Sequence, residues 1–146
     1  MLSYEATAEI NANRESIWRV LAAVDTWPAW LSTVSSVEPL DDQALRLGAR
    51  YRIIQPKLRP ARWIVTLLEP LYRFAWETRS PGLVIVGDHI IHESSPNSST
   101  VVLRISFGGL LGRPVGRLTR NITEHYLTLE AAALKLKVES SDASGV

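Results

Sequence analysis

The chain has 146 residues, of which 46% are hydrophobic and 21% charged, and its formal net charge is +1 at pH 7. This length favours one domain with its own core, and the near balance of charge gives no general attraction to nucleic acid or to a membrane surface. Cysteine is absent, which excludes disulfides, thiolate metal sites and thiol catalysis. We find neither a signal peptide nor an apolar run near the roughly 18 residues of a membrane span, so we expect a cytoplasmic protein.

The start of the chain predicts one strand followed by two short helices. Apolar and polar residues alternate from Tyr4 to Ile10, as they do in a strand with one solvated face. Asn11 or Asn13 can cap the first helix with its side chain. A second short turn is expected over residues 27–30, where Pro28 suits a first helical turn. The apolar residues of this region that we expect to be buried are Ile17, Trp18, Leu21 and Val24.

Six further strands are predicted between turns rich in Pro, Gly, Asp and Ser. Their expected ranges are 34–38, 49–55, 61–68, 73–80, 83–94 and 101–107. The connections between them are short, which favours hairpin neighbours in an antiparallel sheet over parallel crossovers. The sequence therefore predicts an α+β architecture with one antiparallel sheet.

A long amphipathic helix is predicted over residues 114–138, packed on that sheet. Its apolar residues recur at steps of three and four: Val115, Leu118, Ile122, Tyr126, Leu129, Ala133 and Leu136. The charged residues expected on its opposite, solvated side are Arg117, Arg120, Glu124, Glu130, Lys135 and Lys137. We expect residues 1–139 to form one domain and residues 140–146 a flexible tail.

Several short motifs follow one another along nearly the whole chain. They are EATAEINANRESIWRVL at 5–21, DTWPAW at 25–30, LGA at 47–49, LEP at 68–70, GDH at 87–89 and FGGLL at 107–111. In this order they resemble the START-like (SRPBCC) proteins, especially the polyketide cyclase/dehydrase and lipid-transport group. The resemblance implies a helix-grip fold, in which a curved seven-stranded antiparallel sheet wraps around the C-terminal helix and leaves a cavity. Functions within this family are diverse, so the fold alone does not give the activity.

Strand parity and the resemblance together select the side chains that face this cavity. The candidate ligand-binding residues are Trp27, Trp30, Tyr51, Ile53, Trp63, Val65, Phe74, Trp76, His89, Ile91, Leu103, Ile105, Leu118, Ile122 and Tyr126. The polar groups expected to converge inside are His89, Tyr51, Gln55, Thr78 and Tyr126. For each tryptophan, simple packing in the core is the alternative interpretation.

Our leading hypothesis is that a hydrophobic or aromatic small molecule, such as a lipid or a polyketide, binds in the cavity without being transformed. One alternative, implied by the resemblance, is a cyclase- or dehydratase-like enzyme with His89 as general acid and base. A second alternative is an interaction domain like the family's chaperone activators, with an exposed apolar patch and a filled cavity.

We expect no metal and no cofactor. His89 and His92 face opposite sides of one strand, and no carboxylate is spaced to complete a ligand set with them. The arginines are scattered over outer faces and loop ends, which indicates a solvated surface and no nucleic-acid partner. The sequence leaves open a homodimer.

Overall fold

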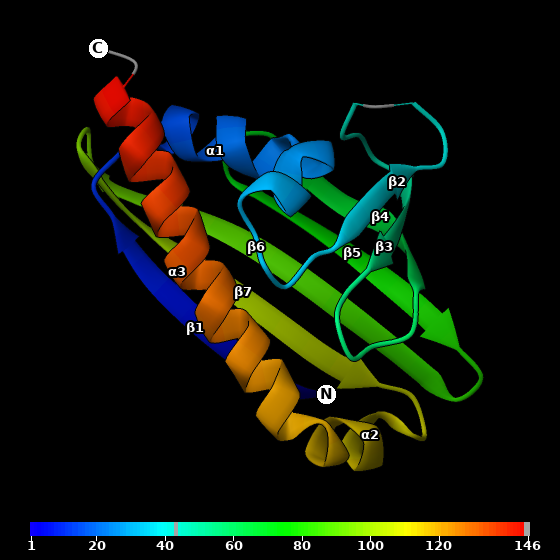
Figure 1. Ribbon diagram of the computed structural model, residues 1–146. Helices are drawn as coiled ribbons and strands as arrows, with labels where there is room; N and C mark the ends of the chain where they lie inside the picture. The colour runs from blue at the N-terminus through cyan, green and yellow to red at the C-terminus, as the bar shows by residue number, and fades with distance from the viewer. Residues whose placement is uncertain (43, 145–146) are drawn as a thin grey trace.

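Seven antiparallel strands form one curved sheet in the order β1-β7-β6-β5-β4-β3-β2 (Figure 1). The computed structural model describes residues 1–42 and 44–144. The strands are β1 (Leu2–Ile10), β2 (Ser36–Pro39), β3 (Arg50–Ile54), β4 (Ala61–Glu69), β5 (Arg73–Ser80), β6 (Leu83–Ser95) and β7 (Ser98–Gly108). From β2 to β7 each strand pairs with its successor in sequence, and β1 pairs with β7 at one edge. The predicted seven-stranded antiparallel sheet is confirmed.

Two short helices, α1 (Arg14–Ala22) and the 3-10 helix η1 (Val24–Ala29), follow β1 as predicted. Of the two candidate caps, Asn13 caps α1: its Oδ1 accepts a hydrogen bond from the backbone N–H of Ser16 at 2.9 Å. Ile17 and Leu21, on the apolar side of α1, are buried in the core. In Figure 1, α1 and η1 cover one end of the concave face of the sheet.

The long C-terminal helix is confirmed, but it is preceded by a separate short helix. The chain forms α2 (Gly112–Leu118) and α3 (Arg120–Ser144), which meet at Thr119. The Thr119 hydroxyl donates a hydrogen bond to the Val115 carbonyl at 2.7 Å, a bond back along the chain that commonly bends helices. Residues 140–144, predicted as the start of a tail, are helical, and residues 145–146 lie outside the described part.

The predicted apolar face of this helix is correct at Val115, Ile122 and Tyr126 but is displaced by about one residue over the rest of the helix. Leu118 and Leu136 are exposed, at 87% and 72%, although both were predicted to face inward. The side chains of α3 that are buried against β1, β7 and α1 are Leu127, Ala131, Leu134 and Val138. The inward face therefore also includes Thr123 and Glu130, polar residues that the search for an apolar stripe placed elsewhere.

Small residues fix α2 against the sheet. A Cβ atom at Gly116 would lie 2.7 Å from Cδ2 of Leu2 and 3.0 Å from the Phe107 ring, and one at Gly112 would lie 2.8 Å from the Phe107 carbonyl oxygen. Only glycine permits so close an approach, so α2 lies directly on β1 and β7. No helix among residues 1–42 and 44–144 is long and apolar enough to span a membrane.

Candidate functional site

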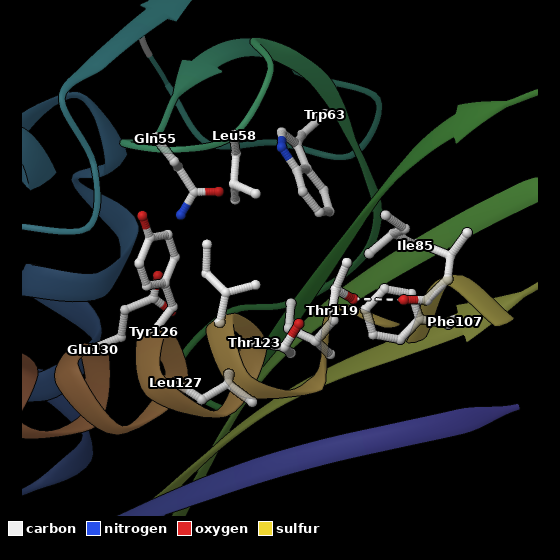
Figure 2. Close-up of a pocket in the computed structure, with 13 residues that line it drawn as sticks. Gln55, Leu58, Trp63, Ile85, Phe107, Thr119, Thr123, Tyr126, Leu127 and Glu130 are labelled. Carbon is white, nitrogen blue, oxygen red and sulfur yellow. Dashed lines mark hydrogen bonds between the residues drawn. The ribbon is translucent and has the colours of Figure 1, made fainter. Parts of the chain in front are cut away.

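A cavity of about 150 Å³ lies between the concave face of the sheet and the α2–α3 segment (Figure 2). Its sheet wall consists of Trp63 on β4, Ile85 on β6, and Ile105 and Phe107 on β7. The helical wall consists of Val115, Thr119, Ile122, Thr123, Tyr126 and Leu127, with Glu130 at one end. Gln55 and Leu58, from the loop between β3 and β4, close the side opposite the helices.

Two smaller hollows of about 50 and 20 Å³ continue from this cavity toward η1. The main cavity and the first hollow share Gln55, Trp63, Ile105, Leu127 and Glu130 as walls. The two hollows share Trp27, His89, Leu103 and Glu130. Glu130 is thus the one carboxylate-bearing side chain common to all three spaces.

Glu130 was predicted on the solvated side of the helix, and this is wrong. Its Oε1 accepts a hydrogen bond of 3.0 Å from the hydroxyl of Thr33, which is itself buried. Burial disfavours the ionised carboxylate and raises the pKa of Glu130 to about 7, although the Thr33 bond acts in the opposite direction. Near neutral pH this side chain can therefore donate a hydrogen bond into the cavity as an acid or accept one as a carboxylate.

His89 is buried and faces inward, as predicted. Its ring stacks on Phe74 with centroids 4.0 Å apart, and its Nδ1 lies 3.1 Å from the Phe74 carbonyl oxygen. Since a carbonyl only accepts, Nδ1 carries the proton and Nε2 keeps the lone pair. Burial lowers the pKa of His89 to about 4, so the imidazole is neutral at pH 7 and a weaker base than an exposed histidine. Its catalytic role stays a prediction.

Most of the predicted ligand-binding residues line these spaces. Trp63, Ile105, Ile122 and Tyr126 line the main cavity. Trp27, Trp30, Ile53, Trp76, His89 and Leu103 line the smaller hollows. Tyr51, Val65, Phe74 and Ile91 are buried as predicted but form the packing behind the walls. Whether any of these residues contacts a ligand stays a prediction, but Leu118 is exposed and is not part of the cavity wall.

Tyr126 links α3 to the loop between β3 and β4. Its hydroxyl donates a hydrogen bond to the carbonyl of Pro56, one residue after the cavity-lining Gln55. Lys57, which follows, has a positive φ of 68°. The tyrosine therefore holds a tight turn of the loop against the helix at the mouth of the cavity.

Sequence reasoning missed the polar part of the helical wall, which is Thr119, Thr123 and Glu130. One signal was available: Glu130 interrupts the otherwise apolar run from Leu129 to Leu134. An acidic residue within such a run lies either on a solvated face or at a cavity, and the sequence did not separate the two. Within the described ranges, no group of three or more His, Cys, Asp and Glu residues is arranged to hold a metal ion.

A curved antiparallel sheet closed by a C-terminal helix around a largely apolar cavity defines the helix-grip class of proteins. The chain belongs to the polyketide cyclase/dehydrase and lipid transport family, whose model matches residues 1–139. A sequence search of curated proteins gave no match.

Solved structures share this fold at low sequence identity. The Zhui aromatase/cyclase from Streptomyces is 16% identical with a TM-score of 0.77, and the match covers 96% of this chain and 94% of that one. Norcoclaurine synthase from Thalictrum flavum is 12% identical with a TM-score of 0.76, covering 97% and 96%. The di-domain ARO/CYC protein BexL is 21% identical with a TM-score of 0.70, covering 97% of this chain and 48% of that one. At these identities the likeness shows the fold alone.

Proposed function

We propose that the protein binds an apolar small molecule that carries a ring and at least one hydrogen-bonding oxygen. The observation that carries this proposal is the cavity of about 150 Å³ with Glu130 at one end of a largely apolar wall. A space of that size holds about one benzene-sized ring, and the few polar groups in its wall suit orientation of such a ligand. The open cavity also favours ligand binding over the interaction-domain alternative, which predicted a filled one.

The pKa of Glu130 indicates which classes of ligand fit the cavity. A carboxyl group with a pKa of about 7 is largely protonated below neutral pH, where it can donate to a carbonyl or hydroxyl oxygen of the ligand. A ligand carboxylate would meet an increasingly charged Glu130 above pH 7, and two like charges in one apolar cavity repel strongly. We therefore favour aromatic ketones, quinones and phenols over fatty acids.

Filling the cavity tests this function. Thr123→Trp places a large ring in the main cavity, and we expect it to weaken binding at least about tenfold, since it takes the space of the ligand's ring. Candidate ligands are first found by quenching of intrinsic tryptophan fluorescence, because Trp63 lines the cavity. Affinities of the variants are then measured by calorimetry, which the added tryptophan does not disturb.

Thr128→Trp is the matched control, since Thr128 is exposed on the same helix. It should bind the ligand with the affinity of the unmodified protein. If no member of a panel of phenols, quinones, aromatic ketones and fatty acids binds, or if Thr123→Trp binds as tightly as the control, the proposed site is wrong.

Glu130 also favours a second candidate function, an enzyme that moves protons during ring closure of a polyketone. As a carboxylate it would take a proton from a carbon next to one carbonyl, and that carbon would form the ring bond by attacking a second carbonyl carbon of the same chain. The π electrons of the second carbonyl move onto its oxygen, and protonated Glu130 would deliver the proton to that oxygen to give a hydroxyl group. This role suits Glu130 better than His89, whose lowered pKa of about 4 weakens it as a base. His89 would instead accept a hydrogen bond at Nε2.

The two candidates differ in one measurement, product formation from a synthetic poly-β-ketone followed by mass spectrometry. If the protein is an enzyme, Glu130→Gln should lower turnover about 100-fold while the ligand still binds. His89→Asn, which keeps a polar side chain in the same hollow, should have the smaller effect. Absence of turnover by the unmodified protein would reject the enzyme and leave the binding function to its own test.

A further inference from the structure

The mouth of the main cavity is flanked by two segments that expose leucines to solvent. The loop at residues 55–60 contributes Leu58, which lines the cavity and is 41% exposed. On the other side, residues 108–118 contribute Leu110 and Leu118, which at 93% and 87% are the most exposed large hydrophobic side chains in the described ranges. Figure 1 shows this loop and α2 at the same end of the molecule, away from α1.

The same two segments are positively charged. Lys57 and Arg59 lie in the loop, and Arg113 and Arg117 lie on α2, all of them exposed. No Asp or Glu occurs between Asp42 and Glu69 or between Glu93 and Glu124, although acidic and basic residues nearly balance over the whole chain, 15 against 16. The two segments that flank the mouth therefore carry four exposed basic side chains and no acidic one.

The orientation of α2 makes these leucines a fixed surface. Gly112 and Gly116 lie on the side of the helix that contacts β1 and β7, where no larger side chain fits. Leu111 and Leu118 lie two helical turns apart, on a different side from these glycines, and both are exposed. Val115, which lies between them, lines the cavity. One short helix thus forms both part of the cavity wall and part of the outer apolar surface.

We propose that this end of the molecule docks reversibly on membranes that contain anionic lipids, and that the ligand passes between bilayer and cavity at this mouth. Leucines at the surface of a bilayer bury apolar area among the acyl chains, and nearby Lys and Arg side chains are attracted to anionic headgroups by about 1 kcal/mol each. The passage of ligand rests on the proposed function, whereas the docking itself does not.

Sedimentation with vesicles tests the docking. The unmodified protein should bind vesicles of phosphatidylcholine and phosphatidylglycerol in equal parts and bind pure phosphatidylcholine far more weakly. The double variant Leu110→Ser with Leu118→Ser should lose at least about tenfold in vesicle affinity, because it removes two leucines that become buried in the bilayer on docking. Arg113→Gln with Arg117→Gln should lose about tenfold or more and should reduce the dependence on salt.

Leu136→Ser is the matched control, since Leu136 is also exposed, at 72%, but lies far along α3 from the mouth. It should bind vesicles like the unmodified protein. The proposal is overturned if the unmodified protein ignores anionic vesicles, or if Leu136→Ser loses as much affinity as the Leu110 and Leu118 pair. It is also overturned if the pair instead abolishes a homodimer seen by analytical ultracentrifugation in the absence of lipid.

Ligand titrations without vesicles separate this proposal from the proposed function. Both double variants should bind the ligand in solution with unchanged affinity, because none of the four side chains lines the cavity. Ligand binding without vesicle binding would reject the docking alone. If the protein binds vesicles but binds no ligand of the panel, the cavity is rejected as a binding site and the docking surface is retained.

Discussion

Replacing Phe74 with alanine is expected to lower the free energy of unfolding by about 3–5 kcal/mol, since the change deletes a fully buried ring. Phe74 lies at the centre of an aromatic cluster. Its ring is 4.0 Å from that of His89 and 5.3 Å from that of Trp76, with Trp18 and Trp27 at 6.3 and 6.4 Å. Its removal leaves a void beneath these rings, which face η1 and the smaller hollows and cannot all collapse into it.

Urea unfolding followed by far-ultraviolet circular dichroism measures this loss, and Tyr72→Ala is the matched control. Tyr72 lies two residues before Phe74 but is half exposed, with the Arg14 guanidinium 4.1 Å above its ring. We expect the control to cost no more than about 1 kcal/mol, the range of an exposed cation–π contact. Equal losses in the two variants would mean that the cluster around Phe74 does not organise the core.

Alternation along the strands made the sheet and its inner face predictable. Tyr51, Ile53, Trp63 and Val65 occupy alternate positions on β3 and β4, and all are buried as expected. Beyond Val65, strict alternation would place Leu67 inward, but the next residue, Leu68, is apolar as well. The structure has an irregularity in the β4–β5 register between Val65 and Leu67, so that Leu68 also packs on the core. A period of two cannot anticipate such a shift.

The helical wall was not predictable in the same way. The prediction assumed that the inward face of a helix is apolar, and this assumption does not hold beside a cavity. An apolar stripe marks the inward face only where the helix packs on a dry core. Here Thr123 and Glu130 face inward onto the cavity, and the apolar Leu118 and Leu136 face solvent. The sequence therefore predicted correctly where a helix forms, but the predicted inward face is displaced by about one residue from the observed one.

The pKa values of Glu130 and His89, two titratable groups of the site, shift in opposite directions for the same reason. Burial lowers the pKa of His89 to about 4 and raises that of Glu130 to about 7. Both shifts favour the neutral form, since an apolar interior disfavours charge of either sign. Below neutral pH the lining of the main cavity, Glu130 included, is therefore largely uncharged, which suits a neutral apolar ligand.

Glu130→Gln is expected to remove a specific part of the pH dependence of stability. In the unfolded chain this carboxyl group titrates near 4.5, and in the folded protein near 7. Between these values the unfolded chain has released a proton that the folded protein keeps, so raising the pH favours unfolding. The stabilisation is complete below pH 4.5, falls as the pH rises toward 7, and amounts to about 3 kcal/mol in all, since one pKa unit corresponds to about 1.4 kcal/mol.

The measurement is the difference in unfolding free energy between the unmodified protein and Glu130→Gln at a series of pH values from 4.5 to 8. Glutamine does not ionise and its Oε1 can still accept from Thr33, so the difference isolates the carboxyl titration. His89, which loses stability in the opposite sense as the pH falls from 6.5 toward 4, contributes equally to both proteins and cancels. Glu124→Gln, at an exposed position on the same helix, should keep the original pH dependence. A difference that stays constant from pH 4.5 to 8 would show that Glu130 is ionised in the fold, and the cavity would then hold a charge that an apolar ligand must avoid.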